Sequence, residues 1–260
     1  ESIFELLENA DQTYFYDSFT ALNLPHNGSD EDRLQMMLMD AKKGKSSLSL
    51  VYITTPDFIG HEFGPNSKEL GNALKKMDSD LEYYTNEVLK INSDTKFMFL
   101  GDHGMAKVEK YIDVESNILK IARINQLKLK TDYIYFLDST LVRLWFFTDN
   151  AKSIFEDHLH NSQDLKTNGI FIDKKIAEEE NIPWGDNRYG DMIWWANSGI
   201  LVYPDFFHRI KLYKGMHGYD TSLEVNNGLC IIYGEDVKKT RHEYIHLSDT
   251  YNILKRLLKL

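Results

Sequence analysis

Carboxylate and imidazole side chains, the groups that bind zinc and related divalent ions, occur close together at three places in the sequence. Asp57 and His61 lie four residues apart in TPDFIGHEFGP. Asp102 and His103 are adjacent in GDHGM, and His217 lies in GMHGYD. Each motif is weak evidence when it occurs alone, whereas three of them in one chain indicate a metal site.

Glycines flank these motifs and determine the backbone that we expect around them. Gly60 and Gly64 lie in the segment of the first pair, so we expect a loop whose sharp turns aim both side chains at one ion. Gly101 and Gly104 bracket the second pair. Adjacent side chains on an extended strand point to opposite faces, but these glycines let the chain leave that geometry. The second pair could therefore serve one ion or face two ions.

Two strands and a helix are the elements that must position the pairs. A compact run of β-branched and apolar residues over 47–55 predicts one strand, and TKFMFL predicts a second. Between them, apolar residues at alternating spacings of four and three predict a long helix over about 67–89. Strand, helix and strand in this order are typical of a mainly parallel sheet, in which ligands bind beyond the carboxyl ends of the strands. We therefore expect an α/β fold with a mainly parallel sheet flanked by helices.

The remaining chain predicts an inserted region within this fold. We expect an α/β metal-binding core over 1–129 and 201–260, and an inserted α+β lid over 130–200. YIYFLDS and LVRLWFF predict a hairpin at the start of the lid, and a helix near 151–160 follows. The other expected elements are a short helix in SIFELLENA, a strand in TYFYD, a helix over about 31–42, a strand over 228–234 and a final helix in DTYNILKRLLKL.

Composition limits the kinds of partner. The chain has 260 residues and a net charge of −10, which argues against general nucleic-acid binding. The negative charge is compatible with small phosphorylated substrates, because bound metal ions reverse the local field at a site. No apolar run reaches the roughly 18 residues that a membrane-spanning helix needs. Neither the compartment nor the oligomeric state follows from the sequence.

In this order, TPDFIGHEFGP, GDHGM and GMHGYD resemble the metal-binding motifs of the alkaline-phosphatase superfamily. They are most similar to those of its type I phosphodiesterase / nucleotide pyrophosphatase branch. The resemblance implies that Asp57, His61 and His217 hold one zinc ion. It implies that Asp102 and His103 supply half of a second site. It also implies two divalent metal ions as cofactors, most simply zinc, and cleavage of a phosphodiester or pyrophosphate bond in a small phosphodiester or nucleotide-like substrate.

The sequence departs from that family in one respect. The family completes its second site with an aspartate and a threonine nucleophile near the N-terminus, but no Asp-Gly strand end followed by Thr-x-Pro precedes residue 50. Thr54 and Thr55 belong to the strand of the first site. We therefore expect the nucleophile to lie outside residues 1–260, in a longer natural protein that acts through a covalent phosphoryl-enzyme. The chain alone is expected to bind one ion well and a second weakly, and to turn over little or no substrate.

Other functions stay open at this point. One alternative is phosphoryl transfer or a mutase reaction of the same superfamily, and another is a non-catalytic metal-binding protein that has lost its nucleophile. HEYIH (His242 to His246) matches the H-E-x-x-H pattern of zinc proteases, which requires a helix. We predict a strand or loop there, because the cap-like residues Ser248 and Asp249 come after it.

Overall fold

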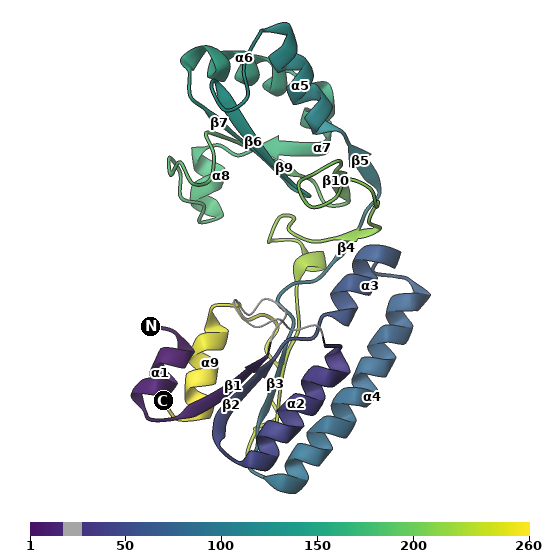
Figure 1. Ribbon diagram of the computed structural model, residues 1–260, viewed down its shortest axis with the longest axis vertical. Helices are drawn as coiled ribbons and strands as arrows, with labels where there is room; N and C mark the ends of the chain where they lie inside the picture. The colour runs from purple at the N-terminus through teal and green to yellow at the C-terminus, as the bar shows by residue number, and fades with distance from the viewer. Residues whose placement is uncertain (18–27) are drawn as a thin grey trace. The chain divides into compact units, whose positions relative to one another are not determined.

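The computed structural model describes residues 1–17 and 28–260. The chain forms two compact units, each with its own buried core (Figure 1). Unit 1 comprises residues 1–59, 68–102 and 228–260, and unit 2 comprises residues 60–67 and 103–227. The predicted domain boundaries, with a lid over 130–200, stay a prediction. None of the helices in the described part of the chain has the length and apolar character that a bilayer crossing requires.

Unit 1 contains most of the elements that the sequence predicts around the two pairs. Helix α3 (Thr55–Phe63) begins in this unit, and its residues from Gly60 onward belong to unit 2. The other elements are α1 (Ile3–Asn9), β1 (Thr13–Asp17), α2 (Asp30–Lys43), β2 (Ser46–Val51), α4 (Lys68–Ile91), β3 (Phe97–Leu100), β12 (Cys230–Tyr233) and α9 (Asp249–Leu258). The predicted long helix and the predicted strands on either side of it are therefore confirmed.

Helix α2 has well-defined ends. Ser29 and Asp32 form a reciprocal capping box at its start, which satisfies two backbone N–H groups that have no partner inside the helix. Gly44 ends the helix in the left-handed conformation (φ 63°), where glycine is favoured. One face of α2 packs against α4, and the two helices lie side by side in Figure 1. Their shared core consists of Leu34, Leu38, Tyr84 and Val88.

The strands of unit 1 form two separate ladders among the described residues. β1 pairs with β2 in parallel, and β3 pairs with β12 in antiparallel orientation. Ile53, just beyond β2, and Phe97 of β3 pack against the same cluster between α2 and α4. The two helices therefore cover both ladders, as expected for an α/β layer.

Unit 2 contains a four-stranded antiparallel sheet in the order β6-β7-β9-β8. The predicted hairpin is confirmed as the β6–β7 pair. The elements are β4 (Ala106–Lys107), β5 (Lys110–Ile112), α5 (Val114–Ile124), β6 (Tyr133–Asp138), β7 (Leu141–Phe146), α6 (Asp149–His160), α7 (Gln163–Asn168), β8 (Gly169–Phe171), α8 (Lys174–Glu179), β9 (Met192–Ala196), β10 (Ile200–Val202), β11 (Gly215–Met216) and the 3₁₀-helix η1 (Glu224–Asn226).

Strand β9 is the centre of the unit 2 core, and all five of its residues are buried. A continuously apolar strand of this kind is covered on both faces. Its two indoles also make polar contacts: Trp194 Nε1 donates to the Leu165 carbonyl (3.1 Å), and Trp195 Nε1 donates to the Gly218 carbonyl (2.9 Å). The second bond ties the core strand to the residue after His217.

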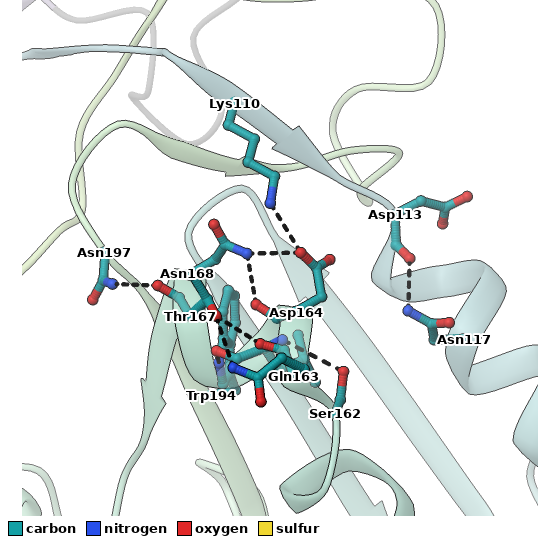
Figure 2. Close-up of polar contacts among 11 residues, drawn as sticks. Lys110, Asp113, Asn117, Ser162, Gln163, Asp164, Thr167, Asn168, Trp194 and Asn197 are labelled. Atoms are coloured by element: carbon teal, nitrogen blue, oxygen red, sulfur yellow. Dashed lines mark hydrogen bonds and ion pairs between the residues drawn. The ribbon is translucent and has the colours of Figure 1, made fainter.

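Polar contacts around α7 hold the short elements of unit 2 in place (Figure 2). Lys110 of β5 forms an ion pair with Asp164 of α7 (2.9 Å). Asn168 donates to the same carboxylate oxygen (2.8 Å), and Asn197 donates to the Thr167 carbonyl (3.3 Å).

Two short ladders complete unit 2. β5 pairs in parallel with β10, and β4 pairs in antiparallel orientation with β11. The strand that precedes His217 is therefore held by a ladder.

Candidate metal centre

The first aspartate–histidine pair lies on a helix, so the predicted loop is wrong. α3 spans Thr55–Phe63, and Asp57 occupies its first turn while His61 occupies its last. Residues four apart share one face of a helix, which aims the two side chains in a common direction without any sharp turn. Gly64, with φ 95°, follows the last residue of the helix and fits its expected role as a turn residue. A carboxylate in the first turn is also favoured by the helix dipole.

Gly215 allows close packing beside Gly60. A side-chain carbon added to Gly215 of β11 would lie 2.4 Å from the Gly60 carbonyl oxygen. The same carbon would lie 2.5 Å from the sulfur of Met105. Gly215 therefore allows β11 to approach α3 more closely than any larger residue at this position would permit.

This close approach fixes the imidazole of His61. Its Nδ1 lies 2.8 Å from the Gly215 carbonyl oxygen. A carbonyl only accepts hydrogen bonds, so Nδ1 carries the proton, and in the neutral imidazole Nε2 is the nitrogen that could bind a metal ion. This is the arrangement of a metal-binding histidine whose second nitrogen is held by a neighbouring acceptor.

His217 lies directly after β11, and two donors fix the backbone that follows it. The Gly218 carbonyl accepts from Thr140 Oγ1 (2.8 Å) and Trp195 Nε1 (2.9 Å), and Gly218 itself has φ 86°. The His217 ring centre lies 5.1 Å from that of His61. Two imidazoles from distant parts of the chain are thereby brought together.

Asp57, His61 and His217 form a group that could hold a metal ion. One ligand atom from each residue lies within 4.8 Å of the others. All three side chains are half-buried. Two imidazole nitrogens and one carboxylate match the ligand sets of catalytic zinc sites, which leave a further position open for water or substrate. The chemistry of these donors therefore fits the ion that the sequence predicts.

The second pair has a different arrangement. The His103 ring stacks on the His217 ring with centres 3.6 Å apart, and its Nδ1 lies 2.8 Å from the Gly104 carbonyl. Asp102 follows β3, and its charge affects the pKa of Tyr52. Burial raises the pKa of the Tyr52 hydroxyl, and nearby carboxylates raise it further. These carboxylates, from the largest effect on the Tyr52 pKa to the smallest, belong to Asp102, Asp57 and Asp30. The role of Asp102 and His103 as ligands of a second ion stays a prediction.

Neighbours of His61 form a network that lies outside the three predicted metal motifs. The Tyr213 ring lies beside that of His61 (centres 5.2 Å apart), and the His208 ring meets Tyr213 edge-on (4.4 Å). His208 Nδ1 lies 3.0 Å from the fully buried carboxylate of Asp205. Burial alone would raise the pKa of Asp205, but hydrogen bonds from His208 and Ser139 outweigh it and lower the pKa. The three-residue spacing of Asp205 and His208 was the available signal.

The H-E-x-x-H segment is confirmed as non-helical. His242 and His246 lie in an irregular stretch before α9, and both are exposed. The two histidines thus lack the shared helical face that the protease motif requires.

Comparison with known proteins shows the family to which the chain belongs. The family model for type I phosphodiesterase / nucleotide pyrophosphatase matches residues 5–220. The human ectonucleotide pyrophosphatase/phosphodiesterase family member 5 is 22% identical over 243 residues, covering 91% of this chain and 48% of its own length. A venom phosphodiesterase of Naja atra is 27% identical over 247 residues, covering 85% of this chain and 27% of its own length.

Solved structures show the same fold. The structure of human ectonucleotide pyrophosphatase/phosphodiesterase 5 superposes with a TM-score of 0.80 at 21% identity, covering 99% of this chain and 70% of that one. An inactive murine counterpart in complex with AMP gives the same TM-score at 19% identity and the same coverage. The chain spans about half the length of the human curated relative, 48%. From the family match, this chain belongs to the type I phosphodiesterase / nucleotide pyrophosphatase family of the alkaline-phosphatase superfamily.

Proposed function

We propose that the full-length protein hydrolyses phosphodiester or pyrophosphate bonds in small nucleotide-like substrates, with two bound divalent metal ions, most simply zinc. The observation that carries this proposal is the group formed by Asp57, His61 and His217 in a chain of this hydrolase family. The AMP complex of the murine family member supports a nucleotide-like substrate.

In this proposal, Asp57, His61 and His217 hold one ion, and Asp102 and His103 contribute to the second. When bound, the two ions neutralise charge on the phosphoryl group and on the attacking and leaving oxygens. The protein's part is orientation. The bond from His61 Nδ1 to the Gly215 carbonyl (2.8 Å) orients the imidazole, and Nε2 would be its ligand nitrogen. The fixed carbonyl of Gly218 holds the turn that carries His217.

We also propose that the nucleophile is a threonine outside residues 1–260. Its oxygen would displace the leaving oxygen at phosphorus, and water would then displace the threonine oxygen and release the phosphate product. Residues 1–260 alone would then bind metal but turn over little or no substrate.

Metal removal and reconstitution test the proposal. The full-length protein is treated with a chelator, reloaded with zinc, and assayed on a nucleotide diester, a dinucleotide pyrophosphate and a phosphate monoester. We expect activity on the first two substrates to disappear with the metal and to return with zinc. Diester cleavage that survives complete metal removal, or metal-loaded protein that transfers the phosphoryl group only to a second alcohol, would contradict hydrolysis as proposed.

The same measurement on residues 1–260 tests the second part. Metal content is determined by mass spectrometry of the dialysed protein. We expect bound metal with little or no turnover. Full activity of residues 1–260 would show that the nucleophile lies within them.

A further inference from the structure

The start of helix α3 is capped by a residue from another helix. We propose that Asp30 of α2 is a positioning residue for the metal centre: its carboxylate caps the N-terminus of α3 and so fixes the direction in which Asp57 and His61 point. This inference rests on the proposed function only in treating Asp57 and His61 as metal ligands.

The hydrogen bonds around Thr54 define the cap. The Thr54 carbonyl accepts from the backbone N–H of Phe58 (3.1 Å), so Thr54 is the residue that precedes the first turn. Asp30 Oδ1 accepts from the Thr54 backbone N–H (2.9 Å), and Asp30 Oδ2 accepts from the Thr55 backbone N–H (2.9 Å). The next residue, Pro56, has no N–H. The carboxylate therefore satisfies two consecutive N–H groups that a helix start leaves without internal partners.

The helix does not cap itself through its own threonine. A threonine at this position ordinarily accepts a hydrogen bond from a backbone N–H two or three residues later. Here the Thr54 hydroxyl donates to Asp30 Oδ1 (3.0 Å). The helix start is thus tied by three hydrogen bonds to a carboxylate that lies 24 residues earlier in the chain.

Six other helices differ from α3 in this respect. Each begins with a local side chain that accepts a backbone N–H of its own first turn. These caps are Ser2 for α1, Ser29 for α2, Asp113 for α5, Thr148 for α6, Ser162 for α7 and Asp173 for α8. A local cap stabilises a helix but leaves its placement free, whereas a cap from α2 also places α3.

A buried arginine holds the capping carboxylate. Arg33 Nη1 lies 2.8 Å from Asp30 Oδ1, and the side chains of Arg33 and Asp30 are 5% and 15% exposed. Burial alone would raise the pKa of Asp30, but hydrogen bonds from Thr54 and Thr55 outweigh it and lower the pKa. The carboxylate is therefore ionised, oriented from two sides and held on the capped first turn of α2.

The cap lies at the start of the helix that carries the two candidate ligands, so its loss should affect metal binding. Asp57 lies two residues after Thr55, in the first turn, and His61 lies one turn further along the same helix. A shift of the helix start moves both donors together. Residues that hold metal ligands in this indirect way typically change metal affinity by about 10- to 100-fold when they are replaced.

Two variants separate positioning from folding. Asp30→Asn keeps the size of the side chain but replaces one acceptor oxygen by a donor, so one cap bond is lost. It also leaves Arg33 beside a neutral group. The double variant Asp30→Ala with Arg33→Leu removes the whole buried ion pair together with the cap, so no buried charge is left without its partner. Asp113→Ala, which removes the local cap of α5, is the matched control.

The measurements are the dissociation constant for Zn²⁺ and the visible absorption of bound Co²⁺ on residues 1–260, with the folded fraction of each variant determined by circular dichroism. We expect both Asp30 variants to bind Zn²⁺ about 10- to 100-fold more weakly and to show shifted Co²⁺ bands. Asp113→Ala should leave both values unchanged. A helix that was only less stable would lower the folded fraction without shifting the bands.

The outcomes distinguish the inference from the proposed function. If the parent chain binds Zn²⁺ and both Asp30 variants retain its affinity and Co²⁺ spectrum, the positioning role is overturned and the metal centre stands. If the parent chain binds neither ion, the proposed metal centre is overturned and the inference with it. Weaker binding that follows only the folded fraction, with unshifted bands, also overturns the positioning role.

Discussion

The two aspartate–histidine pairs contain the same side chains on different backbones. Asp57 and His61 lie one turn apart on α3, and the helix sends both to one face. Asp102 and His103 are adjacent after β3. The charge of Asp102 raises the pKa of the Tyr52 hydroxyl, whereas the ring of His103 stacks on the ring of His217.

This difference shows that spacing and backbone together decide what a pair can do. The first pair could offer two donors to one ion because one helix face carries both, and His217 joins them in the candidate group. The second pair has its two donors on neighbouring residues: the charge of Asp102 raises the pKa of Tyr52, and the ring of His103 stacks on that of His217. We therefore expect the first pair to dominate metal affinity, and the predictions below test that ranking.

The largest expected effect comes from replacing one histidine of each pair. His61→Asn removes a donor of the candidate group, so we expect the affinity of the tight Zn²⁺ site to fall by more than about 100-fold, beyond the range typical of residues that only support a ligand. His103→Asn is the matched change in the second pair, and we expect the tight site to lose less than about tenfold. Isothermal titration calorimetry on residues 1–260 measures both.

Equal losses in the two variants would break the comparison. They would mean that His103 binds the same ion as His61, and that the helix spacing gives the first pair no advantage. His158→Asn serves as a control, because His158 lies on α6 in unit 2, away from both motifs in the sequence.

The sequence predicted the elements around the site better than the backbone of the site itself. The apolar repeat that predicts a helix over about 67–89 corresponds to α4 (Lys68–Ile91), and the apolar run before Gly101 corresponds to β3. Both are local signals carried by neighbouring residues. The same signals misidentified Thr55–Phe63 as a loop, because Pro56, Gly60 and Gly64 are read locally as turn residues.

The missing information lay far away in the sequence. The start of α3 is capped by Asp30, and the space beside Gly60 is occupied by β11. Strand pairing also depends on residues that are distant in the sequence, because the partner of β3 is β12, near the other end of the chain. The motifs identified Asp57, His61 and His217 as a set through a family resemblance, whereas Tyr213 and Asp30 belong to no motif and follow only from tertiary contacts.

A smaller effect is expected from closing the gap between α3 and β11. Gly215→Ala places a methyl group 2.4 Å from the Gly60 carbonyl oxygen, which forces the backbone apart. Overpacking of this kind typically destabilises a protein by about 1–3 kcal/mol. It should also weaken Zn²⁺ binding, because the bond from His61 Nδ1 to the Gly215 carbonyl is lost. Urea unfolding and calorimetry measure the two effects.

The control for this substitution is a glycine that lies on a helix. Gly71 lies in α4, and an added side-chain carbon there meets nothing within 4 Å. Gly71→Ala should therefore stabilise the protein by roughly 0.5–1 kcal/mol through helix propensity and leave Zn²⁺ affinity unchanged. If Gly215→Ala behaved like Gly71→Ala, the close approach would not be what orients His61.

The smallest expected effect concerns the ring that packs beside His61. Tyr213→Leu removes an aromatic neighbour whose centre lies 5.2 Å from the His61 ring. Aromatic pairs contribute about 0.5–1.5 kcal/mol beyond the area they bury, so Zn²⁺ affinity should fall by roughly twofold to tenfold. The ring that stacks on His103 of the second pair belongs to His217, so replacing that ring would also remove a residue of the candidate metal group.

Tyr213→Phe separates the ring from its hydroxyl. Phenylalanine keeps the contact with His61 and the edge contact with His208, whose ring centre lies 4.4 Å away. We expect Zn²⁺ affinity equal to that of the parent chain. If Phe reduced affinity as much as Leu, the hydroxyl would be the group that acts on the site. If neither substitution changed affinity, the Gly215 carbonyl would be sufficient to orient His61, and the network through His208 and Asp205 would serve the core of unit 2 instead.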